Sequence, residues 1–293
     1  MYNNLIIGAS GKLGKYINLP NSMLTYNKKK IKNGYKLNAN FKLFKNLYDK
    51  YKFKKIILLA GVTDIDKCKL NFKEAKKINV DFPKKIINYI KNKDTKLIFF
   101  STDQIYGNNN NASENSKLNP LNIYSKQKII IENLIKKKIK NYLILRISRV
   151  VLEKDIKGDF ISSFLDSVKK SKPILACDDY YFNFIFSSYL SQCFSFLLKN
   201  NIKGTVNLAG SKSFSFFEIF YLLKKKLVSI GFDNSKIKLI KIKVDDLNFK
   251  ETRAKSIYLN TKKISKLFKS PPDSKKYLFK VFKNKIINQK LIK

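Results

Sequence analysis

The sequence contains no histidine, and this absence excludes several kinds of catalytic chemistry at once. Without an imidazole the chain cannot form a serine–histidine triad, use a histidine general base or bind a metal through histidine. It also lacks tryptophan and has only three cysteines, at Cys68, Cys177 and Cys193. An odd number of widely separated cysteines fits neither a disulfide framework nor a zinc site. We therefore expect no metal, a reducing cytoplasmic location, and catalysis by other groups.

Acidic residues are scarce, with 21 Asp and Glu against 61 Lys and Arg and a formal net charge of +40. Such an excess raises the hypothesis of a nucleic-acid or anionic membrane partner, which should bind a basic patch or stripe. Here the lysines are spread from Lys12 to Lys293. The abundant Lys, Asn, Ile, Phe and Tyr share codons written largely in A and T, so a coding bias accounts for the composition. We expect no specific nucleic-acid partner.

Long hydrophobic runs are also missing. Only residues 180–198 form a stretch of that length without charge, and Asn, Ser and Gln occupy six of its positions. This is too polar for a lipid-facing helix of about 20 residues. We predict a strand or loop followed by a buried helix, no membrane partner, and no signal peptide at the start of the chain.

The first half of the chain alternates short apolar runs with longer helix-like segments. This pattern is typical of a parallel sheet covered on both faces, so we predict an α/β, Rossmann-like, doubly wound fold. The predicted strands are 5–7, 22–26, 56–60, 97–101 and 142–147. The predicted helices are 12–17, 41–51, 72–91 and 123–138, and Pro83 is expected to kink or shorten the third.

After residue 150 the alternation loosens. Helices are predicted at 160–170, 187–199, 216–226 and 261–268, with short apolar runs at 205–208 and 237–244. We expect a NAD(P)-binding domain over residues 1–150 and a smaller mixed substrate-binding lobe over 151–293, segments of which could return to the first domain. Residues 108–111 form a predicted polar loop after a strand end, where open α/β sheets place their ligands.

Three glycines, Gly8, Gly11 and Gly14, lie between the first predicted strand and the first predicted helix. Glycines in this place permit a tight turn and let backbone N–H groups and a helix N-terminus approach a pyrophosphate closely. The spacing is GxxGxxG, the variant found in short-chain dehydrogenases, rather than GxGxxG. The turn therefore predicts a dinucleotide site.

The segment after the second predicted strand indicates which dinucleotide is bound. An acid there accepts the ribose 2′-hydroxyl of NAD, whereas a cation accommodates the 2′-phosphate of NADP. This chain has Lys28, Lys29 and Lys30 and no acid. NADP, as NADPH, is favoured over NAD, with a solvated lysine loop as the alternative interpretation.

The candidate catalytic residues are Thr102, Tyr124 and Lys128. Thr102 follows a predicted buried strand, and Tyr124 and Lys128 are four residues apart, so they share one face of a predicted helix. A nearby ammonium lowers the pKa of a phenol from its usual value of about 10. Tyr124 could then donate or accept a proton near neutral pH. The YxxxK spacing recurs at six other tyrosines, so the preceding strand and hydroxyl distinguish this one.

These motifs resemble those of the extended short-chain dehydrogenase/reductase superfamily, and most of all its dTDP-4-dehydrorhamnose reductase branch. The likeness covers most of the chain. Besides the glycine turn, Ser101 to Asp103, Tyr124 and Lys128, the resembling segments are 59–63, 66–68, Asn79, 145–150, 204–208, 253–256 and 259–260.

The resemblance implies that NADPH delivers hydride to a keto carbon of a nucleotide-linked sugar. It implies that Tyr124 protonates the forming alkoxide, Thr102 hydrogen-bonds the same oxygen, and Lys128 tunes Tyr124 and holds the nicotinamide ribose. The implied cofactor-binding residues are Gly8, Ser10, Gly11, Lys12, Leu13, Lys28, Ala60, Gly61, Thr63, Tyr124 and Lys128. The implied substrate-binding residues are Thr63, Asp103, Asn183 and Arg253.

Several departures from the branch keep the substrate open. Gln104 stands where related dehydratases carry a glutamate, and an amide cannot serve as their base, so dehydration is disfavoured. Residues 181–187 lack the Gly-x-Pro-Thr element of the branch, and no proline follows Arg253. A nucleotide-sugar 4-epimerase with retained NAD and a non-catalytic NADP-binding regulatory subunit remain as alternatives. The oligomeric state also stays open, with a homodimer as one option.

Overall fold

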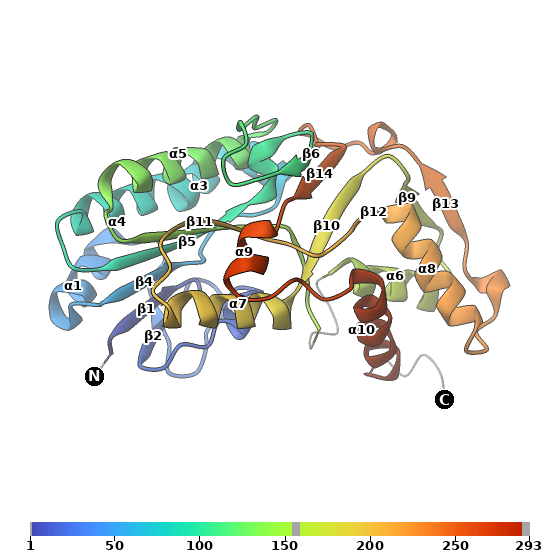
Figure 1. The fold of residues 1–293 in the computed structure, drawn as a ribbon, viewed down its shortest axis with the longest axis horizontal. Helices are drawn as coiled ribbons and strands as arrows, with labels where there is room; N and C mark the ends of the chain where they lie inside the picture. Colours follow the sequence, from blue (N-terminus) through green and yellow to red (C-terminus); the bar gives the residue numbers. More distant parts are fainter. Residues whose placement is uncertain (1, 154–158, 289–293) are drawn as a thin grey trace.

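The computed structural model describes residues 2–153 and 159–288, which are built around a seven-stranded and a five-stranded sheet (Figure 1). In the seven-stranded sheet the strand order is β11-β7-β5-β4-β1-β2-β3, and every neighbouring pair is parallel. Its strands are β1 (Asn4–Ile7), β2 (Ser22–Tyr26), β3 (Tyr35–Lys36), β4 (Lys55–Leu58), β5 (Lys96–Thr102), β7 (Tyr142–Ile147) and β11 (Gly204–Leu208).

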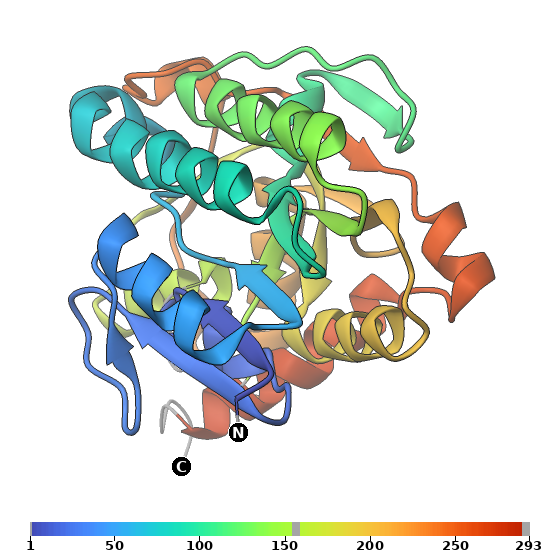
Figure 2. The same cartoon turned by 90° about the vertical axis from the view of Figure 1, so that its left-hand side faces the viewer.

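Helices cover both faces of this sheet, because successive side chains of a strand point to opposite sides. Leu5 of β1 packs with α1 (Phe41–Tyr51), α4 (Phe82–Ile90) and α5 (Ile123–Lys138). Its neighbour Ile6 packs with α7 (Ser187–Lys199) and α9 (Lys262–Leu267). Figures 1 and 2 show α4 and α5 on one side and α7 on the other. The predicted doubly wound parallel sheet is confirmed.

The second sheet is mixed. Its order is β12-β10-β14-β6, and β8 pairs with β10. The pairing of β10 with β12 is antiparallel and the other pairings are parallel. The strands are β6 (Asn109–Ala112), β8 (Arg149–Val151), β10 (Tyr181–Phe186), β12 (Ser213–Ser215) and β14 (Ser256–Leu259).

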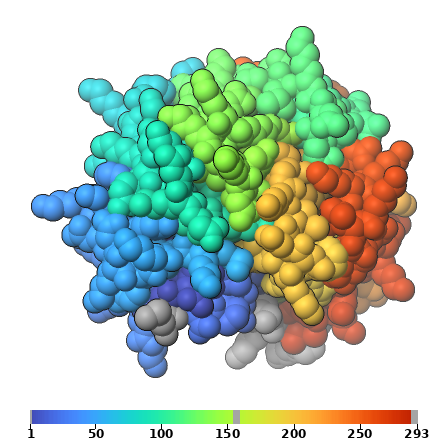
Figure 3. All heavy atoms as spheres, turned by 60° about the vertical axis from the view of Figure 1, so that its left-hand side comes forward, coloured from blue at the N-terminus to red at the C-terminus, as the bar shows by residue number. Residues whose placement is uncertain are grey.

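An aromatic core joins this sheet to α6 (Phe160–Lys169), α8 (Phe216–Val228) and α10 (Ser274–Asn288). A parallel pair, β9 (Ile174–Cys177) and β13 (Leu239–Ile242), lies beside them. The two halves of the chain exchange elements: β6 joins the second sheet, and β11, α7 and α9 pack in or on the first. In Figure 3 the first half (blue to green) and the later segments (yellow to red) meet along one continuous surface. The division at residue 150 stays a prediction.

Two predicted helices differ from the structure. The predicted helix 12–17 is only a single 3₁₀ turn, η1 (Gly14–Tyr16). Pro20 disfavours helical geometry at the residue before it, and the glycine turn occupies the preceding segment, so no room for an α-helix remains. The predicted helix 72–91 is divided into α3 (Phe72–Lys76), a π-helical turn η2 (Lys77–Asp81) and α4, with Pro83 in the first turn of α4.

The predicted polar loop at 108–111 also differs, because residues 109–112 form β6 and pair with β14. Backbone pairing with a distant segment overrides the polar side chains there. Residues 181–198 form β10 and most of α7, as predicted. Within the described residues, no helix has both the length and the apolarity that a membrane crossing needs.

Candidate active site

A cavity of about 1040 Å³ lies at the carboxyl ends of the strands of the seven-stranded sheet and extends to the second sheet. Parallel sheets bind ligands at this edge, where the loops diverge. Of the predicted site residues, those that line the cavity are Gly8, Gly11, Lys12, Leu13, Gly61, Thr63, Thr102, Asp103, Tyr124, Lys128 and Arg253. The fold thus brings most of the predicted site together from five separate segments.

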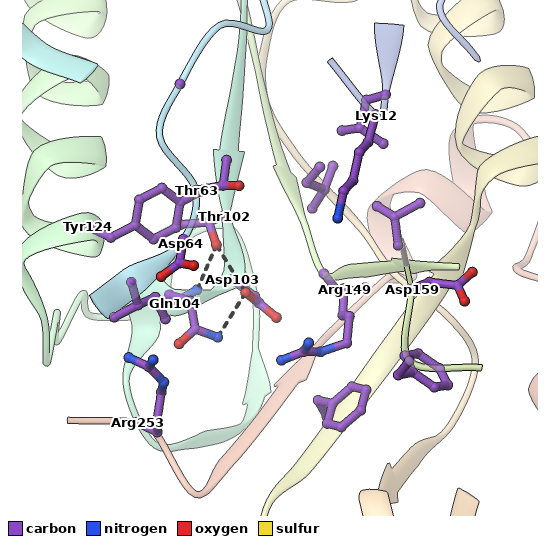
Figure 4. A pocket seen from close by; sticks show the side chains of 18 of the residues that line it. Lys12, Thr63, Asp64, Thr102, Asp103, Gln104, Tyr124, Arg149, Asp159 and Arg253 are labelled. Atoms are coloured by element: carbon purple, nitrogen blue, oxygen red, sulfur yellow. Dashed lines mark hydrogen bonds between the residues drawn. The ribbon is translucent and has the colours of Figure 1, made fainter. Parts of the chain in front are cut away.

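The glycine turn between β1 and η1 forms one wall. A Cβ at Gly8, whose φ is +92°, would lie 2.6 Å from the Ala60 nitrogen, and one at Gly14 would lie 1.9 Å from the Ala9 carbonyl oxygen. Only glycine fits at these two positions. The α-helix expected after the turn is absent, so the predicted helix N-terminus does not face the cavity. Lys12, on the same turn, places a cation there instead (Figure 4).

Three predicted cofactor-binding residues, Ser10, Ala60 and Lys28, are not among the described residues that line the cavity. Ala60 packs against Gly8, and its backbone N–H donates to the Ile7 carbonyl at 2.9 Å. Lys28 is exposed in the segment after β2. Its contact with a cofactor stays a prediction.

Tyr124 is held at the start of α5, facing the end of β5. The helix begins with a capping box, in which Asn122 Oδ1 accepts from the Ser125 backbone N–H at 3.0 Å. The Asn122 amide also donates to the Thr252 carbonyl, which ties this end of the helix to the loop before β14. Tyr124 is 7% exposed and lines the cavity with Thr102 (Figure 4).

The protonation of Tyr124 differs from the sequence prediction. Burial raises the pKa of the Tyr124 phenol above its ordinary value and outweighs the lowering effect of a hydrogen bond with Thr102. Lys128 Nζ lies 5.8 Å from the Tyr124 ring centroid and donates to the Phe100 carbonyl at 2.8 Å. Burial in turn lowers the pKa of Lys128 to about 8. The Tyr124 phenol is therefore protonated at neutral pH, whereas the sequence predicted that Lys128 would lower its pKa.

The space above Lys128 is kept open by a glycine and an asparagine. The Asn79 side chain accepts from the Val62 N–H at 2.8 Å and donates to the Val62 carbonyl at 3.0 Å and to Gln127 at 2.8 Å. A Cβ at Gly61 would lie 3.2 Å from Asn79 Oδ1 and 3.8 Å from Lys128 Nζ. Asn79 therefore fixes the segment after β4, and the missing side chain at Gly61 avoids a close contact with Asn79 beside the buried Lys128.

Asp103 orients the groups at the end of β5. Its Oδ1 accepts from the Thr102 hydroxyl at 3.1 Å and from the Gln104 amide at 3.2 Å (Figure 4). Burial raises the pKa of the Asp103 carboxyl, although these hydrogen bonds lower it. The Gln104 Oε1 atom has no partner among the described residues. The Asp103 and Gln104 side chains thus position Thr102 and leave a buried amide oxygen without a partner among the described residues.

Arg253 lines the cavity from the loop before β14. Its Nη2 lies 3.0 Å from Asp66 Oδ1, and the same oxygen accepts the backbone N–H groups of Lys250 and Glu251 at 3.1 Å. Asp66, a residue of α2 (Ile65–Leu70), therefore holds this loop against the helix. Arg253 and Thr63 remain candidates for substrate binding.

The structure contradicts the predicted substrate-binding role of Asn183. Its side chain is 0% exposed, and its amide donates to the Gly210 and Leu259 carbonyls at 3.0 and 3.1 Å. Its Oδ1 accepts from the Leu259 N–H at 3.2 Å. The residue joins β10 to β14 and has no free polar group, so it is unsuited to bind substrate. The sequence interpretation failed because a buried asparagine in a strand satisfies backbone groups that only the tertiary pairing brings near.

Sequence reasoning missed the far end of the cavity. Arg149 and a group of aromatic side chains line it; the aromatic residues are Phe160, Tyr180, Phe182, Phe216, Phe220 and Phe249. Ser101 and Ser148 line the cavity at the ends of β5 and β7, and their buried hydroxyls have no hydrogen-bond partner among the described residues. No local pattern marks the aromatic residues, since they come from distant segments. Across the described residues, no cluster of acidic or cysteine side chains is arranged to hold a metal ion.

Comparison with known proteins gives consistent matches. The family model described as RmlD substrate binding domain matches residues 3–285. A hypothetical dTDP-4-dehydrorhamnose reductase from Sulfolobus tokodaii is 25% identical, with 92% of this chain and 96% of that chain covered and a TM-score of 0.80. The dTDP-4-dehydrorhamnose reductase of Bacillus anthracis, solved with NADP, is 21% identical, with coverage of 97% and 100% and a TM-score of 0.81.

A curated relative, the dTDP-D-glucose 4,6-dehydratase of Dictyostelium discoideum, is 28% identical over 213 residues. The match covers 64% of this chain and 48% of the relative, so it spans about half of that protein's length.

Proposed function

Because the chain belongs to the RmlD substrate binding domain family, we propose that it is an NADPH-dependent reductase of a keto group on a nucleotide-linked sugar. The observation that carries the proposal is the arrangement of Tyr124, Thr102 and Lys128 in one cavity with the glycine turn. Relatives of the same fold are named dTDP-4-dehydrorhamnose reductases, and one of them was solved with NADP.

The residues of the cavity fit a dinucleotide. Gly8, Gly11 and Gly14 expose backbone to the cavity, and Gly61 leaves room above Lys128 for a bound group. The unpartnered hydroxyls of Ser101 and Ser148 are available to a polar ligand. Lys12 supplies the positive charge that a helix N-terminus would otherwise offer to a pyrophosphate. Bound NADPH would supply the hydride.

The side chains supply the proton. As the carbonyl carbon gains hydride, the π-electron pair of the C=O bond moves to oxygen, and Tyr124 gives its phenolic proton to that oxygen. The raised pKa of Tyr124 keeps the donor protonated at neutral pH. The Thr102 hydroxyl, which donates to Asp103 in the structure, would turn from that carboxylate to donate to the same oxygen. Lys128, one helical turn from Tyr124, stabilises the phenolate that remains.

Reduction is favoured over dehydration by the geometry at Gln104. The Gln104 amide donates to Asp103, and an amide has no basic site at neutral pH. A dehydration that removes a proton from the sugar carbon would need a base at this place. The similarity to a dehydratase covers about half of that relative's length and does not change the residue at this position, which is a glutamine and not a base.

Incubating the protein with NADPH and a panel of 4-keto nucleotide sugars tests the proposal. We expect loss of the reduced-nicotinamide absorbance and formation of one hydroxyl epimer of the product. Interconversion of nucleotide-sugar epimers without net consumption of NADPH would identify an epimerase instead. Tight NADPH binding without turnover of any substrate would favour a non-catalytic subunit.

A further inference from the structure

Arg149 is a cation in the cavity that the proposed reduction does not use. It begins β8, two residues beyond the end of β7, and is exposed to the cavity. Its guanidinium lies 5.0 Å from the Phe182 ring centroid and 5.1 Å from the Phe216 ring centroid. Two aromatic rings hold the planar group in one orientation. In Figure 4 Arg149 extends into the cavity beside Asp103.

No acid within the described residues lies at ion-pair distance from Arg149, whereas Arg253 and Asp159, which also line the cavity, each have an ion-pair partner. Arg253 pairs with Asp66 at 3.0 Å, and Asp159 pairs with Lys285 at 3.2 Å. The Asp103 carboxylate accepts from Thr102 and Gln104. Among the residues that the structure describes, Arg149 therefore faces the cavity without a hydrogen-bond or ion-pair partner.

The position of Arg149 indicates which part of a ligand it meets. On one side of Arg149 lies Asp103, next to Thr102, where the carbonyl would react. The positive charge of Arg149 is close enough to lower the pKa of Asp103, although burial raises it overall. On the other side lie the aromatic residues of the far end, beginning with Phe182 and Phe216. In an extended ligand that spans the cavity, Arg149 therefore lies beside the middle part, between the reacting end and the end that stacks on aromatic rings.

We infer that Arg149 binds an oxyanion of the substrate, between the reacting carbonyl and the aromatic end of the cavity. The inference rests on the proposed function and adds a specificity determinant to it. A guanidinium held flat donates two parallel hydrogen bonds to a phosphate or a carboxylate. In a nucleotide sugar this oxyanion is either the diphosphate that joins sugar and nucleoside or a carboxylate on the sugar ring. A neutral ligand would leave the guanidinium unpaired.

Calorimetric titration of Arg149→Gln, Arg149→Lys and the control Lys172→Gln in the presence of NADP tests the inference. Lys172 is exposed and is not among the described residues that line the cavity, so the control removes the same charge elsewhere. The ligands are dTDP-glucose, UDP-glucose, UDP-glucuronic acid and the nucleosides thymidine and uridine. The thermal midpoint of each variant is measured first to establish that it is folded.

If the diphosphate is the oxyanion, Arg149→Gln weakens all three nucleotide sugars by about 10-fold to 100-fold and leaves thymidine and uridine unchanged. If it is a sugar carboxylate, only UDP-glucuronic acid is weakened. In both cases Arg149→Lys loses less affinity and Lys172→Gln none. Affinities of Arg149→Gln within about twofold of the wild type, or an equal loss for nucleosides, would overturn the inference while leaving the proposed function intact. Failure of the wild type to bind any nucleotide sugar would instead remove the proposed function, and the inference with it.

Discussion

Replacing Tyr124 by phenylalanine removes one oxygen atom and with it the proposed proton donor. The ring packs beside Cys68 and Ala75, and phenylalanine preserves these contacts. Loss of the hydroxyl should change the free energy of unfolding by only about 1 kcal/mol. Most of the implied cofactor-binding residues lie in the glycine turn and the segment after β4 and keep their contacts, so we expect the affinity for NADPH to stay within about twofold of the wild type.

Turnover should fall far more than stability. A positioned general acid contributes about 10² to 10⁴ in rate, which corresponds to about 3 to 5 kcal/mol of transition-state stabilisation. Single-turnover oxidation of enzyme-bound NADPH by a keto nucleotide sugar measures this step directly. Fluorescence titration of NADPH measures cofactor binding separately, so the two effects can be distinguished.

Tyr48→Phe is the matched control. Tyr48 is also buried, at 3% exposure, and its hydroxyl is 2.6 Å from that of Thr95, but it packs from α1 into the core and is not among the described residues lining the cavity. We expect this variant to lose some stability and to keep its rate. A folded Tyr124→Phe protein that turns over within about threefold of the wild type would refute the role of the phenol. An equal loss of rate in both variants would attribute the effect to packing.

The remaining predictions concern the charge of Lys128, the preference for NADPH over NADH, and the glycine turn. Burial lowers the pKa of Lys128 from 10.5 to about 8. Keeping Lys128 charged therefore lowers the free energy of unfolding by about 3 kcal/mol below pH 8. Lys128→Met should therefore raise the free energy of unfolding at pH 7, with a gain that vanishes as pH rises from 8 to 10.5, while turnover falls; a gain independent of pH in denaturant titrations would contradict this. NADPH should bind about 5-fold to 150-fold more tightly than NADH through residues 28–30, and the ratio should shrink with salt; equal affinity in low-salt titrations would show that these lysines make no contact. Gly14→Ala should abolish NADPH binding, because its Cβ would lie 1.9 Å from the Ala9 carbonyl oxygen. At Gly231 a Cβ meets nothing within 4 Å, but φ is +89°, so Gly231→Ala should lose some stability and still bind NADPH. NADPH binding by Gly14→Ala would show that the turn can move.

Elements with strong short-range signals could be predicted from the sequence. The helices at 41–51 and 123–138 have the predicted bounds, and each begins after an asparagine whose side chain caps it. The strand at 142–147 also has its predicted bounds, because buried parallel strands are rich in apolar residues and only Arg146 interrupts this run. The spacing of Tyr124 and Lys128 on one helix face and the hydroxyl of Thr102 at a strand end are likewise local properties.

Features that depend on distant segments could not be predicted. Residues 109–112 are polar, yet they form β6, because β14 offers backbone partners from far along the chain. Asn183 is of a residue type that often binds ligands, but its side-chain amide hydrogen-bonds backbone groups of Leu259 in β14 and of Gly210. A polar side chain in a sequence does not reveal whether it faces a cavity or an unpaired backbone group.

The sequence by itself determined the sheet, the helices that cover it, and the residue types that could carry the chemistry, since each of these follows from patterns only a few residues long. The tertiary structure alone decided how those residues behave. Burial, which no spacing reports, raises the pKa of Tyr124 and lowers that of Lys128, reversing the relation expected from their proximity. The orientation of Arg149 between Phe182 and Phe216 likewise arises from segments far apart in the chain. Desolvation and the alignment of charges are properties of the folded cavity, so they follow from the packing of the whole molecule.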